Sequence, residues 1–262
     1  MYRAMGTTKQ NIHQRMIGAL KGKHQQGQLK KIIEEVRRDH PEMGAKSLYM
    51  KLKPSTLGRD RFYDWYRENG LTITPRRNWR RTTDSSGVIR FSNIIQDREL
   101  TSVNQVWVSD ITYYQINEQF HYITLVMDQY SRKIKGYSAS ESLHMESTTV
   151  PAIKMAMRGL PQGDRPIIHS DGGGQYYGHK FLSITRDRLK NSMGKTAYEN
   201  PHAERLNRTI KDQYLRHYNP QSQKELEQKL THAVKMYNQG KPHTSLGGST
   251  PEEFEKNLLM SN

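Results

Sequence analysis

Apolar residues in the N-terminal part of the chain recur three and four positions apart, which is the spacing of one face of an α-helix. Residues 29–41, LKKIIEEVRRDHP, are the clearest example, with an apolar stripe made by Leu29, Ile32, Ile33 and Val36. Residues 4–16 predict a glycine-containing turn and a short helix. Two more helices are predicted over residues 44–53 and 59–70, the second ended by Gly70.

From residue 103 the pattern changes to the alternation typical of β-strands. Residues 104–116 alternate and are rich in β-branched and aromatic side chains. Residues 119–140 predict two strands that turn at Tyr130–Lys133. A helix, a short apolar strand and two more helices follow, over residues 145–160, 165–171, 176–189 and 199–211. This order predicts a mixed α/β domain whose sheet is covered by helices on both faces.

The charge of the chain is distributed unevenly. The formal net charge is +15, of which +11 lies in residues 1–100 and +4 in the remainder. A strongly basic segment beside a segment with little net charge indicates a nucleic-acid-binding module attached to a second domain, whose acidic residues have a function of their own. A membrane surface is the alternative partner, but the basic helices lack the long apolar face that would favour it. We therefore expect residues 1–74 to form an all-α, helix-turn-helix-like DNA-binding region.

Composition restricts the possible chemistry further. The chain has no cysteine, which excludes disulfides and thiolate metal sites and leaves oxygen or imidazole as metal ligands. No apolar run approaches the ~20 residues that cross a bilayer, and no charged and then apolar leader opens the chain. We expect a soluble intracellular protein with no membrane partner.

Residues 75–97 have the composition of a basic linker. Within them, PRRNWRRTTDSSG places Trp79 among four arginines, Arg76, Arg77, Arg80 and Arg81. Arginines in this pattern can follow a phosphate backbone while the indole stacks or anchors the segment. A solvated tether explains the same composition, so both interpretations stay open.

Three acidic residues stand at positions where a carboxylate needs an explanation. Asp110 lies inside an apolar strand, where its charge is costly unless a cation compensates it. Asp171 ends the strand PIIHSD, at the edge where open α/β sheets place ligands. Glu204 lies in the first turns of the helix over residues 199–211, which Asn200 is expected to cap. Taken alone, Glu204 is better explained by an exposed pair with Arg208, because such pairs are common on helices.

If these acids converge, they suit a hard cation such as Mg²⁺, which prefers oxygen ligands and keeps room for water and phosphate. Two ions about 3.5–4 Å apart can activate a nucleophile and stabilise a leaving oxygen in an in-line phosphoryl displacement. Other polar residues compete for this site. We expect Asp128 to cap a turn, Glu199 to point elsewhere, and His169 to be a hydrogen-bonded strand residue, with a place beside the acids as the alternative for Asp128 and His169.

Five segments occur in an order that resembles the OrfB-type transposases of bacterial insertion sequences, which share a catalytic core with retroviral integrases. They are WVSDITYY, MDQYSRKIKGY, HSDGGGQY, NPHAERLNRTIK and YNQGKPHTSLGGSTPEEF. The resemblance implies a ribonuclease-H-like core with a mixed five-stranded sheet flanked by helices. It also implies a DDE site of Asp110, Asp171 and Glu204 that holds two Mg²⁺ or Mn²⁺ ions. Lys211 matches a basic residue that approaches the element-end DNA in integrases.

The resemblance implies a catalytic core over residues 98–217 and a C-terminal helical tail over residues 218–262. The expected activity is metal-dependent 3′-end cleavage and strand transfer at the terminal inverted repeats, in the bacterial cytoplasm and on the nucleoid when bound to DNA. We expect at least a dimer on DNA, and an upstream frameshift product as a possible fusion partner. The expected DNA contacts are Asn207, Arg208, Lys211, Arg59, Arg61, Arg76, Arg77, Arg80 and Arg81.

The sequence departs from the family pattern in small ways. The 32 residues between Asp171 and Glu204 are slightly fewer than is typical, which predicts a trimmed loop or edge strand ahead of the catalytic helix. Lys241 stands where the family commonly has arginine. Two other functions remain as alternatives: a ribonuclease-H-type nuclease that only hydrolyses, and a DNA-binding regulator with an inactive core.

Overall fold

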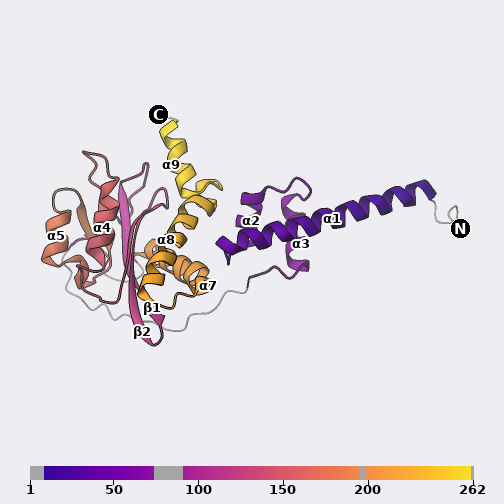
Figure 1. Ribbon diagram of the computed structural model, residues 1–262. Coiled ribbons are helices and arrows are strands. Elements are labelled where there is room, and N and C mark those ends of the chain that lie inside the picture. The colour runs from indigo at the N-terminus through magenta and orange to yellow at the C-terminus, as the bar shows by residue number, and fades with distance from the viewer. Residues whose placement is uncertain (1–8, 74–90, 195–198, 261–262) are drawn as a thin grey trace. The chain divides into compact units, whose positions relative to one another are not determined.

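The computed structural model describes residues 9–73, 91–194 and 199–260. The chain forms two compact units, which divide between Ile73 and Thr74. Figure 1 shows the helices of the first unit and the sheet with its helices in the second. Each unit is described by itself.

The first unit consists of three helices, α1 (Lys9–Asp39), α2 (Ala45–Leu52) and α3 (Arg59–Glu68). The prediction of two separate helices before residue 41 is wrong, because α1 continues from Lys9 to Asp39 without a break. No proline interrupts this stretch, and a glycine inside a helix costs only about 1 kcal/mol relative to alanine, so the intervening glycines do not end it. The helices over residues 44–53 and 59–70 are confirmed.

A small apolar core holds these helices together. It contains Leu29, Ile33, Met43, Leu48, Phe62, Trp65, Tyr66 and Leu71. Arg37 adds a polar tie, since its guanidinium donates to the Tyr66 hydroxyl at 2.5 Å and to the Leu71 carbonyl at 2.6 Å. Ile32, predicted to belong to the apolar stripe of α1, is 44% exposed, so the buried face is narrower than the pattern indicated. Gly70 follows α3 with a φ of 64°, the left-handed conformation expected of a glycine that ends a helix.

The second unit is built on a mixed five-stranded sheet in the order β3-β2-β1-β4-β5. The strands are β1 (Val106–Ile116), β2 (Gln119–Asp128), β3 (Ile134–Ser140), β4 (Ile167–Ser170) and β5 (Lys190–Met193). β1, β2 and β3 pair antiparallel, while β4 runs parallel to β1 and β5 parallel to β4. Alternation predicts the first three strands and a short apolar run predicts the fourth. The fifth is expected only from the family resemblance, because four residues with one strongly apolar side chain carry little periodic signal.

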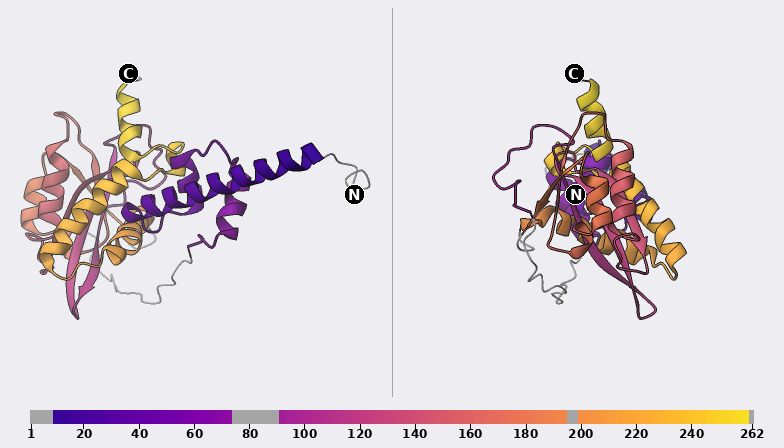
Figure 2. Two further views of the ribbon diagram at one scale, coloured as in Figure 1. Left: turned by 45° about the vertical axis from the view of Figure 1, so that its right-hand side comes forward. Right: turned by 90° about the vertical axis from the view of Figure 1, so that its left-hand side faces the viewer.

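Helices cover both faces of this sheet, as the views in Figures 1 and 2 agree. One face packs against α4 (Thr149–Arg158) and α5 (His179–Thr185), with Trp107, Ile153, Ile168 and Phe181 among the buried residues. The helix predicted over residues 176–189 is therefore shorter than expected. Pro151 lies in the first turn of α4, as predicted. Among the described residues, no helix is long and apolar enough to span a membrane.

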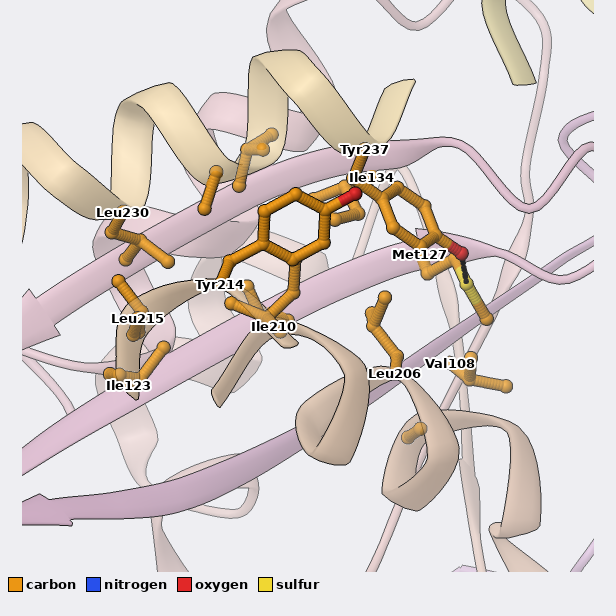
Figure 3. Close-up of a cluster of buried hydrophobic side chains, with 14 of the residues drawn as sticks. Val108, Ile123, Met127, Ile134, Leu206, Ile210, Tyr214, Leu215, Leu230 and Tyr237 are labelled. Carbon is orange, nitrogen blue, oxygen red and sulfur yellow. Dashed lines mark hydrogen bonds between the residues drawn. The ribbon is translucent and has the colours of Figure 1, made fainter. Parts of the chain in front are cut away.

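The opposite face packs against a run of helices from the C-terminal part of the chain. These are α6 (Pro201–Arg208), the π-helix η4 (Thr209–Leu215), α7 (Arg216–Tyr218) and α8 (Gln223–Gly240), followed by α9 (Pro251–Met260). Figure 3 shows Leu206 and Ile210 directed at the strands beside Val108 and Met127, with Tyr237 of α8 donating to the Met127 sulfur at 3.8 Å. This apolar core holds α6 against β1 and β2, and so fixes the position of Glu204.

Candidate active site

Asp110 lies on β1, and Asp171 directly follows the last residue of the adjacent parallel strand β4. Val108 of β1 pairs with His169 of β4, and each aspartate lies two residues further along the chain. Because side chains alternate between the faces of a sheet, both acids lie on the face of Val108, which packs against α6. The register of the sheet therefore brings the two predicted acids close together, on the face that α6 covers.

Asp110 is held by hydrogen bonds and shielded from water. One of its carboxylate oxygens accepts from the Asn207 side chain at 2.8 Å and the other from the backbone N–H of Ile111 at 2.8 Å. Burial raises the pKa of Asp110 to about 7, and the charges of Asp171 and Glu204 act in the same direction, that of Asp171 more strongly. The three predicted acids are thus near enough for their charges to interact.

Asp171 lies at the start of a tight loop that follows β4. Its Oδ1 accepts from the Gly173 backbone N–H at 3.1 Å, and its carbonyl accepts from the Tyr177 hydroxyl at 2.6 Å. A Cβ at Gly173 would lie 3.0 Å from the Asp171 carboxylate, so a glycine lets the loop close around the acid. Burial raises the pKa of Asp171. These hydrogen bonds therefore hold Asp171 in position, but they supply no opposite charge to its carboxylate.

Glu204 is an exposed side chain one turn into α6. Pro201 occupies the first turn as predicted, but the expected side-chain cap by Asn200 is absent from this helix end. Instead the buried Asn200 amide donates to the Ser109 carbonyl at 3.0 Å, one residue before Asp110. This bond ties the start of α6 to the strand that carries the first acid.

The structure places the other predicted residues of this helix face in different surroundings. Asn207 is buried and contacts Asp110, rather than standing on an open DNA-facing surface. Lys211 lies in the π-helix η4 and donates to the Thr112 hydroxyl at 3.1 Å, two residues beyond Asp110 on β1. Arg208 is exposed. Burial lowers the pKa of Lys211, and the charge of Asp110 opposes this shift.

The competing polar residues have structural partners. Asp128 is fully buried and accepts backbone N–H bonds from Asn104, Tyr130 and Ser131, which confirms the predicted turn cap. The ring nitrogens of His169 contact the Ser192 hydroxyl at 2.9 Å and the Glu199 carbonyl at 3.2 Å. The Glu199 carboxylate accepts from Asn93 at 2.6 Å, away from the acids. The interpretations that kept these residues outside the site are confirmed.

The remaining predicted DNA contacts belong to the first unit or to the segment that follows it. Arg59 and Arg61 are exposed on α3 of the first unit, where Arg59 forms an ion pair with Asp60 at 2.9 Å. Arg76, Arg77, Arg80 and Arg81 lie outside the described residues.

Two contacts of the site were missed from the sequence. Asn207 had been assigned to DNA, and nothing was expected of Tyr177, which holds the Asp171 loop. The helical spacing of Asn207, three residues after Glu204, was the available signal for its position on the acid-facing side of α6. The Tyr177 contact had no periodic signal, because it depends on how the loop after β4 folds.

The donor set fits a hard divalent cation. Asp110 and Asp171 present carboxylate oxygens at adjacent positions, and neither forms an ion pair within residues 91–194 and 199–260. Two like charges shielded from water favour an added cation, and oxygen donors suit Mg²⁺ or Mn²⁺. In the same part of the chain, no three His, Asp or Glu side chains surround one ion position as they stand. Glu204, being exposed, is the donor that would have to turn towards the aspartates.

Two family models, both described as integrase core domain, match this unit over residues 101–194 and 186–251. The uncharacterized 31 kDa protein of insertion element IS600 from Shigella sonnei is 30% identical over 206 residues, covering 76% of this chain and 75% of that protein. Transposase InsF for insertion sequence IS3A from Escherichia coli (strain K12) is 29% identical over 168 residues, covering 62% of this chain and 58% of that protein.

One solved structure extends the comparison to the fold. The simian T-cell lymphotropic virus intasome, in complex with the PP2A regulatory subunit B56 gamma, aligns with a TM-score of 0.50 at 16% identity. The alignment covers 82% of this chain and 71% of that chain. At this identity the likeness concerns the fold alone, and it agrees with the mixed five-stranded sheet.

Proposed function

This chain belongs to the integrase-core transposases of insertion sequences, and we propose that it cleaves and joins DNA at the ends of its element with Asp110, Asp171 and Glu204 as catalytic acids. The observation that carries the assignment of residues is the sheet register, which sets Asp110 beside Asp171 under the helix that bears Glu204. A second support is the pKa of Asp110, which burial raises to about 7 with a further contribution from the charges of Asp171 and Glu204.

The two aspartates would hold the divalent ions, and Glu204 would complete one coordination shell. When bound, such ions lower the pKa of a water and stabilise the charge that develops on the phosphoryl oxygens. Asn207 holds the Asp110 carboxylate in one orientation by its 2.8 Å hydrogen bond. Lys211 donates to Thr112, which lies on the same strand as Asp110. Its ammonium would therefore place a positive charge near the acids, where an incoming phosphate could bind.

Two in-line displacements at this one site would account for the reaction. In the first, a water oxygen attacks a phosphorus at the element end, the P–O bond to the 3′ oxygen breaks, and that oxygen leaves as a 3′-hydroxyl. In the second, the 3′-hydroxyl attacks another phosphodiester and displaces a second 3′ oxygen, so that one P–O bond forms as one breaks. Neither step needs a covalent protein–DNA intermediate. We propose that at least two protomers pair two element ends.

The test is a strand-transfer assay with duplex oligonucleotides carrying the ends of the element that encodes the chain, in Mg²⁺. We expect joined products from the wild type and a joining rate at least about 100-fold lower in Glu204→Gln. DNA binding should be retained in the variant, because a metal ligand contributes to transition-state stabilisation and not to DNA affinity. Glu146→Gln is the matched control, because Glu146 is exposed and lies in the turn before α4. Joining by Glu204→Gln at the wild-type rate would refute the site; nicking without joining in the wild type would indicate a nuclease.

A further inference from the structure

The flank of α6 that faces away from Glu204 carries basic and imidazole side chains. With 3.6 residues per turn, the buried residues Ala203 and Leu206 separate Glu204 on one flank from His202 and Arg205 on the other. The first flank faces Asp110, through Asn207. The second flank faces the turn between β2 and β3, where Arg132 Nη1 lies 2.7 Å from His202 Nδ1.

Two more residues join this flank from the segment that follows α8. The Lys241 ammonium donates to the Gln213 side chain in η4 at 3.1 Å. The His243 ring lies 5.0 Å from the Tyr237 ring, and the charges of Lys241 and Arg132 both act on it. We define the α6 basic cluster as Arg132, His202, Arg205, Lys241 and His243.

The charged members of the α6 basic cluster lack ion-pair partners in the part of the chain that the structure describes. The carboxylate that acts on Arg132 is Asp128, and its oxygens already accept three backbone N–H bonds. Buried charges in proteins are normally paired, because taking a lone charge out of water is costly. Arg132, Arg205 and Lys241 therefore give the cluster more positive charge than the one carboxylate that acts on Arg132 offsets.

Other features of the cluster are consistent with this excess of positive charge. Burial and the charges of Lys241 and Arg132 lower the pKa of His243 to about 4. The His243 Nε2 is buried and has no hydrogen-bond partner among the described residues. Arg132 has a φ of 62°, a left-handed conformation that is strained for a non-glycine residue. The fold thus accepts backbone strain and unpaired charge at the same place.

We propose that the α6 basic cluster binds a phosphate of the DNA backbone on the side of the catalytic helix opposite the acids. A phosphodiester supplies the missing negative charge and accepts hydrogen bonds from the guanidinium and ammonium groups. The helix is about 10 Å wide, so the bound phosphate is a neighbour of the scissile one and not the scissile one itself. The cluster would then fix the path of the strand across α6. This inference rests on the proposed function, since it takes DNA as the ligand.

The test compares Lys241→Met with Lys154→Met, which removes an exposed lysine from α4 on the opposite face of the sheet. Affinity for the element-end duplex is measured with the full chain over a range of salt concentrations, with a chelator present so that no cleavage occurs. We expect Lys241→Met to bind DNA more weakly and to lower the slope of log affinity against log salt by about 0.9, the change for one phosphate contact. Lys154→Met should leave the slope unchanged.

Thermal unfolding distinguishes this role from a structural one. A lone buried cation costs stability in the free protein, so Lys241→Met should unfold at the wild-type temperature or above it. A lower unfolding temperature with an unchanged salt slope would overturn the proposal, as would equal slope changes in both variants. If Lys241→Met does not fold, Arg205→Gln replaces it, because Arg205 is exposed and the same slope change is expected.

A measurement with inorganic phosphate distinguishes a site for free phosphate from a site for a DNA phosphate. Stabilisation of the wild type by free phosphate, with no change of DNA salt slope in Lys241→Met, would show a free-anion site and overturn the DNA proposal. Because binding is measured without metal, the result does not depend on catalysis. A wild type that binds DNA through the cluster but neither cleaves nor joins would refute the proposed function and leave the phosphate site standing.

Discussion

At the scale of single residues, Asp110 is a carboxylate that the fold holds away from water without an opposite charge. Its carboxylate is largely removed from water and receives hydrogen bonds from Asn207 and Ile111, but it has no ion pair in the described chain. The nearby charge of Asp171 makes ionisation harder still. The metal-free protein therefore carries an electrostatic cost at this position, which a bound cation would relieve.

This cost predicts a pH-dependent effect of Asp110→Asn on stability. The folded pKa of about 7 lies above the ordinary value of 3.8, so the folded state binds this proton more tightly than the unfolded state does. Wild-type stability should fall as pH rises from about 4 to 7, and Asp110→Asn should escape that loss. In chelator at pH 8, we expect the variant to be more stable by on the order of 2 kcal/mol, and equal to wild type at pH 4.

Thermal unfolding at both pH values measures this difference. Asp187→Asn is the control, because it makes the same substitution at an exposed position. A variant whose advantage over wild type is the same at pH 4 and pH 8 would contradict the assignment of the cost to the Asp110 charge.

At the scale of elements, the two layers of helices are held differently. On one face, Leu206 and Ile210 of α6 and η4 pack into an apolar core with residues of β1, β2 and α8 (Figure 3). On the other face, α4 approaches β3 so closely that backbone meets backbone at Gly136. The position of α6 therefore depends on side-chain volume, while that of α4 depends on the absence of a side chain.

Gly136→Ala should destabilise the protein strongly. A Cβ at this position would lie 2.1 Å from the Ala152 carbonyl oxygen and 2.8 Å from the Ala156 nitrogen, so α4 would have to move. Overpacking of this kind costs typically 1–3 kcal/mol, and we expect about 3 kcal/mol because the obstacle is backbone. Gly159→Ala, at the end of the same helix, has open space and is the control. Denaturant unfolding measures both, and equal effects would show that the close approach is not the cause.

At the scale of the whole molecule, the excess charge and the acids belong to different parts of the chain. Of the net charge of +15, +11 lies in residues 1–100, ahead of Asp110, Asp171 and Glu204. Under the proposed function, this arrangement would assign most of the charge-dependent DNA binding to residues 1–100 and the chemistry to the acids of the second unit. The core of α1, α2 and α3 leaves basic side chains such as Arg59 and Arg61 exposed.

We expect the double variant Arg59→Gln, Arg61→Gln to bind duplex DNA more weakly at low salt. If each arginine contacts one phosphate, the slope of log affinity against log salt should fall by about 1.8. The control is Arg158→Gln, Arg186→Gln, which removes two exposed charges near α4 and α5. An equal fall in both double variants would show that net charge alone, and not the first unit, determines DNA affinity.

The sequence pattern predicts those elements whose formation depends mainly on residues close together in the chain. The alternation of β1, β2 and β3 and the apolar stripe of α6 follow from which side chains must be buried within one element. The acids Asp110 and Asp171 were visible as charges out of place at a strand interior and a strand end. The family resemblance then supplied the common role of the three acids and the fifth strand, neither of which periodicity contains.

Only the tertiary structure decided what depends on distant partners. The strand β5 exists because β4 offers it hydrogen bonds, and α1 is continuous although its sequence contains several glycines. Asn207 turns to Asp110, 97 residues away, because the core under α6 sets the rotation of that helix. The α6 basic cluster likewise unites residues 132, 202 and 241 by packing. Such contacts depend on the energies of segments far apart in the chain, which no local pattern records.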